Sequence, residues 1–178
     1  IGFVLDTDTP VIWRGPMVMK AIEQLMGDVD WGELDFMILD MPPGTGDAQL
    51  TVAQKIGLAG AVIVSTPQDV ALIDARKGLA MFRKMEVPVL GLVENMSTFV
   101  CPQCGTETAI FRSGGGERTA NELGVPFLGS IPLDAEIAVG GDAGVPIVVK
   151  HPDGAHAAAF RRLAEAVRVA VAERLRAN

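Results

Sequence analysis

The sequence predicts an α/β fold in which a doubly wound, mostly parallel sheet has helices on both faces. Its short apolar runs are continuous rather than alternating, which is typical of strands covered on both faces. Helical patterns separate these runs, so we expect right-handed crossovers between successive parallel strands. In such a sheet, ligands bind outside the carboxyl ends of the strands. We therefore expect one domain over residues 1–178, with function in the loops after its strands.

The expected strands and the first two helices alternate along the chain. The four apolar runs that predict strands are residues 36–39, 61–64, 89–93 and 127–131. Helices are predicted over residues 47–56 and 69–85, the second after a capping segment at residues 66–69. The expected buried face of that second helix contains Leu72, Ile73, Leu79 and Ala80.

Two further helices follow. Residues 117–123 are predicted to form a helix that ends at Gly124, because glycine readily adopts the left-handed conformation after a helix. The last helix is expected over residues 155–176, with five exposed charged positions: Arg161, Arg162, Glu165, Arg168 and Glu173. Its expected core stripe is Phe160, Leu163, Val167, Ala170 and Leu175.

Residues 98–116 form a long predicted loop that is rich in glycine and cysteine. Residues 113–119 (Ser-Gly-Gly-Gly-Glu-Arg-Thr) are glycine-rich, but a phosphate-binding loop ends in Lys-Ser or Lys-Thr, and every lysine here precedes another residue type. We interpret this segment as a flexible turn before a helix.

His151 and His156 have no acidic or cysteine cluster beside them in sequence, so surface or capping roles are expected.

Composition excludes several classes of partner. The chain has 178 residues, a hydrophobic content of 49%, a formal net charge of −7 and a pI near 4.8, which argue for a globular domain and against a nucleic-acid partner. Residues 58–64, the longest apolar stretch, are far too short to cross a membrane. Two cysteines favour free thiols in a cytoplasmic setting. The chain starts at Ile1 rather than Met, which indicates a segment of a longer protein.

The first candidate loop follows the run at residues 36–39. Asp40 ends that expected strand, where nucleotide hydrolases place a carboxylate that serves Mg²⁺; capping of the next turn is the alternative. The sequence continues Met-Pro-Pro-Gly-Thr-Gly-Asp, and Gly44 leaves a bare backbone N–H that can approach a phosphate oxygen. Asp47 then starts a helix whose positive end faces the same way.

The second candidate loop is Cys-Pro-Gln-Cys-Gly at residues 101–105. Thiolates at this spacing can bind one metal centre, but a four-thiolate site needs two more than Cys101 and Cys104 provide. A symmetric homodimer would supply them. A redox dithiol and a pair of unliganded structural thiols remain as alternatives. Asn95, after the run at residues 89–93, is placed to read a base edge, although an asparagine there is usually a turn residue.

Together these segments resemble the Mrp/ApbC family of ATP-dependent iron–sulfur cluster carriers. The resemblance covers nearly the whole chain, and it lies in residues 13–20, 30–35, 40–47, 94–97, 101–104 and 129–134.

The resemblance implies a homodimeric, MinD-like P-loop ATPase whose subunits share a [4Fe–4S] cluster through Cys101 and Cys104 and deliver it to apo iron–sulfur proteins. It also implies that Asp40 holds Mg²⁺ through water, that Gly44 senses the terminal phosphate of ATP, and that Asn95 and Pro132 contact the nucleotide. The Walker A loop of that family would lie upstream, so this N-terminally truncated chain is expected not to hydrolyse ATP by itself. A zinc-bridged structural dimer and a membrane-positioning MinD-like ATPase are the alternatives.

Overall fold

The computed structural model describes residues 15–42 and 44–177, with the solvent exposure of Gly15, Asp47 and Ala177 outside the description. These residues belong to two compact units, Ile1–Ile56 and Gly57–Asn178. The apolar start of the chain and residues 13 and 14 of the family-like segment at 13–20 lie outside the described residues. The single-domain organisation stays a prediction.

The first unit is built on two helices, α1 (Gly15–Gly27) and α2 (Asp47–Lys55), which pack against each other. Val52 of α2 is buried, and Lys55 forms an ion pair with Glu23 of α1. Irregular backbone joins the helices, and Trp31 Nε1 donates a hydrogen bond to Leu25 O at 2.8 Å, which fixes the start of that connection. The predicted helix at residues 47–56 is confirmed by α2.

The predicted strand at residues 36–39 is wrong, because this segment has no regular secondary structure. Its side chains are largely open to solvent, with Ile38 80% exposed and Phe36 50% exposed. A strand needs a neighbour to satisfy its backbone N–H and C=O groups. Within the described ranges, no segment pairs with these residues. An apolar run is thus necessary for a buried strand but does not create one.

The second unit contains a four-stranded sheet centred on β2 (Val89–Val100). Strands β1 (Ala61–Ser65) and β4 (Phe127–Leu133) pair with β2 in parallel, and the short β3 (Glu107–Thr108) pairs with its far end antiparallel. The three strand predictions in this unit are confirmed, although β2 runs well past residue 93. The predicted long loop at residues 98–116 is wrong in part, because residues 98–100 belong to β2 and a hairpin follows.

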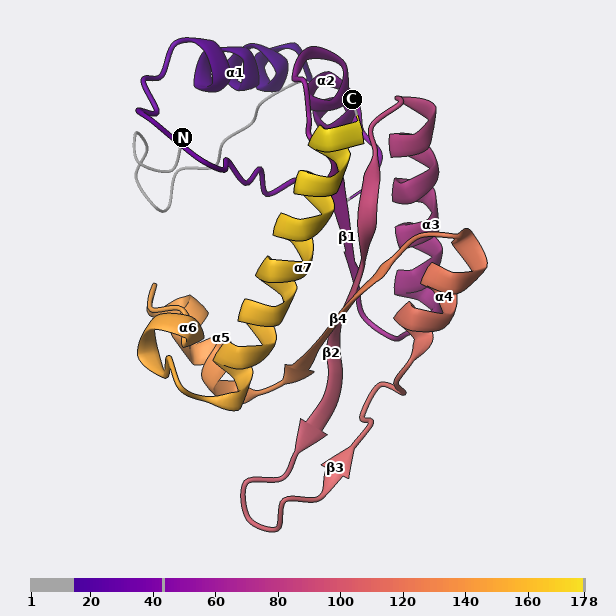
Figure 1. Cartoon of the computed structure of the whole chain (residues 1–178), viewed down its shortest axis with the longest axis vertical. Coiled ribbons are helices and arrows are strands. Elements are labelled where there is room, and N and C mark those ends of the chain that lie inside the picture. The colour runs from indigo at the N-terminus through magenta and orange to yellow at the C-terminus, as the bar shows by residue number, and fades with distance from the viewer. Residues whose placement is uncertain (1–14, 43, 178) are drawn as a thin grey trace. The chain divides into compact units, whose positions relative to one another are not determined.

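Helices cover both faces of this sheet, as predicted. Helices α3 (Asp69–Lys84) and α4 (Gly115–Leu123) pack on one face, and α7 (Ala155–Ala177) packs on the opposite face (Figure 1). The core on the α7 side is built on Val93, Ile131 and Ala159. Helices α5 (Ala135–Asp142) and α6 (Ile147–Lys150), which were not predicted, lie between β4 and α7 in sequence. Gly124 ends α4 at φ +62°, as predicted.

Two buried faces differ in detail from the prediction. In α3, Ile73 and Ala80 are exposed, and the buried side chains are Leu72, Ala75, Leu79 and Phe82. Those four positions recur every three or four residues, whereas Ile73 and Ala80 lie one position further round the helix. In α7, the five charged positions are exposed as predicted, but Leu175 is 68% exposed, so the core stripe ends before it.

Candidate functional site

The two cysteines lie in the tight turn that joins β2 to β3. Cys101 N donates to Thr106 O at 3.0 Å and Gly105 N donates to Cys101 O at 2.8 Å, so the turn is closed from both sides. Gly105 has φ +70°, a left-handed conformation that favours glycine. The β2–β3 hairpin extends past the helices of the second unit (Figure 1). Cys101 and Cys104 lie in the connection between the two strands, near the tip of this hairpin.

The electrostatics of this turn favour a thiolate at Cys104. Cys104 is exposed, and its Sγ lies 3.2 Å from Thr106 Oγ1. This side-chain hydrogen bond is the largest cause that lowers the pKa of the Cys104 thiol, followed by the Thr106 backbone and the Cys101 side chain. A thiolate is the form that binds metals and attacks disulfides. The side chain of Cys101 beside it is half-buried.

These two thiols do not form a complete metal site in one chain. Among the described residues, no group of three or more His, Cys, Asp or Glu side chains could hold a metal ion. A thiolate-bound metal centre needs four ligands in its closed form. The hairpin can therefore provide half of such a centre, at an exposed position that a second molecule can reach.

Asn95 and Pro132 lie together on neighbouring parallel strands. Asn95 of β2 is in register with Ile131 of β4, the residue before Pro132. Both side chains are half-buried. Asn95 Oδ1 accepts a hydrogen bond from Met96 N at 2.9 Å, so the amide is oriented by the backbone that follows it. Met96 has φ +55°, an uncommon conformation that marks a local departure from regular strand geometry.

A buried carboxylate beside Asn95 was missed by the sequence analysis. Glu94 is 2% exposed, and its side chain accepts hydrogen bonds from Gly114 N at 3.1 Å and Gly116 N at 2.6 Å. A Cβ on Gly116 would lie 2.9 Å from Glu94 Cβ, so this glycine allows a close approach. The interpretation of residues 113–119 as a turn before a helix is confirmed, and Glu94 is the partner that the turn binds. Residues 90–94 of β2 are all buried, so no alternation along the strand marks Glu94 as the residue with a polar partner inside the protein.

The first unit contains the other predicted nucleotide residues. Asp40 is exposed and lines a mostly apolar cavity of about 460 Å³. Gly44 has φ +95° and is exposed, and Gln49 Nε2 donates to Pro42 O at 2.6 Å, which ties α2 to this loop. Asp47 is the first residue of α2, and its side chain lies outside the description.

The structure therefore brings together some of the predicted site residues and not others. Cys101 and Cys104 share one turn, and Asn95 lies beside Pro132, all in the second unit. Asp40, Gly44 and Asp47 belong to the first unit, so the structure does not group them with the cysteines. Their assignment to Mg²⁺ and phosphate stays a prediction.

The two histidines have acidic neighbours that are distant in sequence. His156 Nε2 lies 3.1 Å from Asp134 Oδ2, and His151 Nε2 lies 3.6 Å from Glu136 Oε2. All four side chains line a cavity of about 190 Å³. The pKa of Glu136 is lowered, first by its hydrogen bond to Lys150 and then by the charge of Lys150. These contacts tie α5 to α6 and α7, which is a structural role at the surface.

No helix in residues 15–42 or 44–177 is both long enough and apolar enough to cross a membrane.

The open sheet, the parallel order of its central strands and the helices on both faces define a doubly wound α/β protein with a cysteine hairpin. The family model described as ParA, NUBPL iron-transfer P-loop NTPase, matches residues 1–168, and the chain belongs to this family. The predicted family resemblance is therefore confirmed.

Two relatives illustrate the match in sequence. The iron-sulfur cluster carrier protein of Synechocystis is 54% identical over 168 residues, which cover 94% of this chain and 48% of that protein. The iron-sulfur cluster transfer protein NUBPL of Mus musculus is 52% identical over 167 residues, which cover 94% of this chain and 52% of that protein. The chain thus spans about half the length of the curated relatives it matches.

Solved structures support the fold. A nucleotide-binding protein from Archaeoglobus fulgidus, in complex with ADP, aligns with TM-score 0.67 and 39% identity, covering 78% of this chain and 56% of that chain. The cell division ATPase MinD of Pyrococcus furiosus aligns with TM-score 0.62 and 26% identity, covering 87% of this chain and 58% of that chain. The predicted MinD-like P-loop NTPase fold is confirmed.

Proposed function

We propose that the whole protein to which this chain belongs is an ATP-dependent iron–sulfur cluster carrier. Two copies would hold a [4Fe–4S] cluster as cargo between their hairpins and pass it to apo iron–sulfur proteins. The observation that supports this most is the pair of thiols near the tip of the β2–β3 hairpin, where Cys104 is exposed and its pKa is lowered. A labile cargo must be reachable by its recipient, and an exposed hairpin tip meets that requirement.

The homodimer is part of the proposal because one chain has half of the ligands. A two-fold axis between two hairpins would turn Cys101 and Cys104 into a set of four thiolates. The side-chain hydrogen bond between Cys104 Sγ and Thr106 Oγ1 is the largest cause that lowers the pKa of the Cys104 thiol, which favours the thiolate that iron binds. Backbone hydrogen bonds from Gly105 and to Thr106 close the turn, and the Cys101 side chain is among the groups that lower the pKa of Cys104, so both thiols belong to one closed turn.

The nucleotide is proposed from the fold and from the roles that the family resemblance gives to four residues. Asn95 and Pro132 would face the base, Asp40 would serve Mg²⁺ through water, and Gly44 would approach the terminal phosphate. The Archaeoglobus neighbour is described in complex with ADP, which supports nucleotide binding at this type of site. The described residues include no lysine-containing phosphate loop, so we propose no hydrolytic step for this chain by itself. ATP hydrolysis is proposed for the whole protein.

A zinc-bridged structural dimer is the second candidate. The Cys-Pro-Gln-Cys-Gly turn, closed by the bond from Gly105 N to Cys101 O, is also compatible with a zinc knuckle. Zinc would use the same four thiolates but would fix the dimer rather than leave with a recipient. A reducing compartment such as the cytoplasm would suit either metal centre, and a relative from Arabidopsis thaliana is named a mitochondrial protein.

Anaerobic reconstitution with iron and sulfide tests the proposal. We expect about four iron and four sulfide ions per dimer on a sizing column, with broad absorption from thiolate-to-iron charge transfer. Cys101→Ala should abolish iron binding. Gln103→Ala is the matched control, because Gln103 is exposed in the same turn and provides no thiolate. Iron retained by Cys101→Ala would refute the cluster assignment, and colourless protein with stoichiometric zinc would favour the structural dimer.

A further inference from the structure

Glu94 is a buried charge that the proposed function does not use. It lies in the middle of the sheet, where β2 is in register with Ser65 of β1 and Ser130 of β4, and it is 2% exposed. A carboxylate that is removed from water destabilises the fold strongly unless hydrogen bonds replace its hydration. The two bonds to the backbone of the α4 N-terminus provide that replacement.

The contact is made by both carboxylate oxygens. One oxygen accepts from Gly114 N at 3.1 Å, and the other accepts from Gly116 N at 2.6 Å. The positive end of the α4 dipole favours an anion at this place. Gly114 has φ +73°, a conformation that favours glycine. A Cβ on Gly116 would lie 3.2 Å from Glu94 Oε2, so the absence of a side chain there lets the carboxylate approach the backbone.

The contact closes the base of the cysteine hairpin. Strand β2 runs outward from Glu94 to Cys101, and after β3 the chain returns to the sheet at Gly114. The returning arm is also attached by Arg112, whose Nη1 lies 3.0 Å from Asp69 Oδ2 at the start of α3. Both arms of the hairpin are thus attached at Glu94, the outgoing arm by covalent continuity and the returning arm by hydrogen bonds.

We propose that Glu94 is a positioning residue that couples the nucleotide-contact end of β2 to the cysteine hairpin. Asn95 is the next residue in the strand, so a change in its backbone moves Glu94, and through Gly114 and Gly116 it moves the returning arm of the hairpin. This coupling rests on the proposed function, because it needs a nucleotide at Asn95 and a cluster at Cys101. Glu94 itself touches neither of them.

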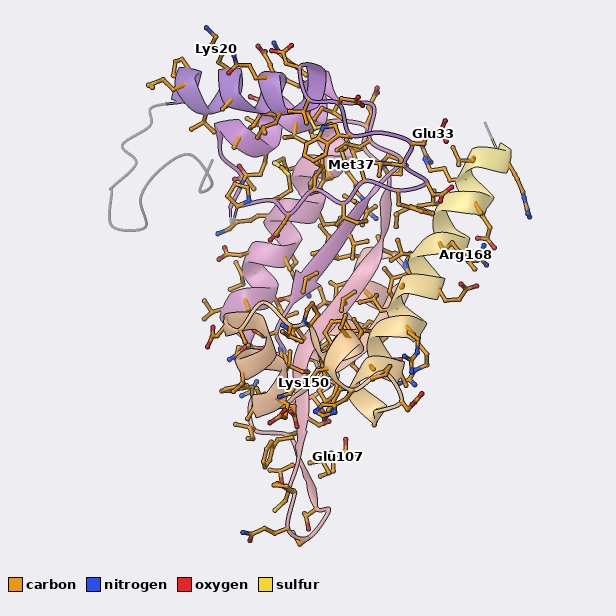
Figure 2. The ribbon with its side chains drawn as sticks, turned by 90° about the vertical axis from the view of Figure 1, so that its left-hand side faces the viewer. Lys20, Glu33, Met37, Glu107, Lys150 and Arg168 are labelled. Carbon is orange, nitrogen blue, oxygen red and sulfur yellow. The ribbon has the colours of Figure 1, made fainter. Side chains whose placement is uncertain are left out.

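The anchoring contact has a test that is independent of function. In the whole protein, Glu94→Gln replaces one acceptor oxygen by an NH₂ group and removes the charge, so at least one bond to the α4 N-terminus is lost. We expect amide hydrogen exchange in the peptide over residues 109–118 to become about tenfold faster, since hydrogen bonds to charged groups contribute most. Glu107→Gln is the matched control, because Glu107 is exposed on the hairpin itself (Figure 2). Equal exchange in both variants would refute the anchor.

The coupling is tested by cluster release with and without Mg-ATP. We expect Glu94→Gln to load iron and sulfide as the parent protein does, but to release the cluster at the same rate with and without nucleotide. Glu94→Asp keeps the charge on a shorter side chain, so it should lose part of the change in release rate that Mg-ATP causes. It is the test variant if Glu94→Gln does not fold. Glu107→Gln should keep the full change in release rate.

The outcomes separate this inference from the proposed function. A parent protein that releases its cluster in response to Mg-ATP, together with Glu94 variants that respond equally, would overturn the coupling and leave the carrier function intact. A parent protein that binds no iron, or whose release ignores Mg-ATP, would overturn the proposed ATP-dependent carrier and the coupling with it.

Discussion

Two glycine-containing turns of the second unit differ in whether a side chain from another part of the described chain binds to them. The turn at Cys101 and Cys104 is exposed, and its thiols have no ligand from another part of the described chain. The turn at Gly114 and Gly116 is closed by the carboxylate of Glu94 from inside the protein. Glycine in a loop is therefore not evidence of a binding site: burial and the partner decide whether a turn is open to a ligand or already occupied by the chain.

The largest expected effect is on metal binding at the exposed turn. Cys104→Ala should abolish iron binding after reconstitution, because it removes two of the four ligands of the proposed dimer. Since Cys104 is exposed, the free energy of unfolding of the metal-free protein should change by less than about 0.5 kcal/mol. Iron analysis and urea denaturation measure the two effects. Retained iron would contradict the role of Cys104 as a ligand. Strong destabilisation of the metal-free variant would contradict the claim that this turn is exposed and not needed for the fold.

The second prediction concerns the occupied turn. Gly116→Ala should lower the free energy of unfolding by about 1–3 kcal/mol, because the added Cβ would lie 2.9 Å from Glu94 Cβ and 3.0 Å from Leu92 Cδ2. Gly78→Ala is the matched control in α3, where nothing lies within 4 Å of the added Cβ, and it should stabilise by about 0.5–1 kcal/mol. Urea denaturation measures both. Similar effects at Gly116 and Gly78 would mean that Glu94 does not occupy the turn.

The third prediction concerns the reactivity of Cys104. Thr106→Val removes the largest cause that lowers the pKa of the Cys104 thiol, so that pKa should rise. The midpoint of alkylation against pH should therefore move to higher pH, and the rate at neutral pH should fall, because the thiolate is the reactive form. Thr108→Val on β3 is the control, since its side chain is exposed and Thr108 is not among the causes of the shift. An unchanged midpoint in Thr106→Val would show that Thr106 does not set the reactivity of Cys104.

The smallest expected effect is at the ion pair between Arg112 and Asp69. Both side chains are mostly exposed, so Arg112→Ala should lower the free energy of unfolding by less than about 1 kcal/mol. The remaining attachment of the returning arm, through Glu94, should hold the hairpin in place. A loss as large as that expected for Gly116→Ala would mean that the ion pair, rather than Glu94, anchors the arm.

The sequence predicted the sheet of the second unit because its strands are short, apolar and covered on both faces. It failed at residues 36–39 for a physical reason: hydrophobicity reports burial, whereas a strand also needs a neighbour in register. The opposite case occurs at the end of β2. Its last residues pair with neighbouring strands although they are half-buried or exposed, and they were therefore assigned to a loop.

Among the candidate site residues, the cysteine pair could be found from spacing alone, because both thiols lie in one turn. Asn95 was predicted from its place after an apolar run and Pro132 through the family resemblance, whereas their proximity required the register between β2 and β4. Glu94 could not be assigned from its own segment, since its partners at Gly114 and Gly116 lie far along the chain. A glycine triplet before a helix suggested flexibility, and only the fold shows that it accommodates a buried carboxylate.

Native mass spectrometry of the reconstituted whole protein shows whether two copies share one cluster. We expect a dimer whose added mass is that of one Fe₄S₄ unit, with monomers that hold no metal, and no such species for Cys104→Ala. A metal-loaded monomer, or a dimer that contains zinc and never iron and sulfide, would contradict the claim that the hairpins of two copies share a cluster.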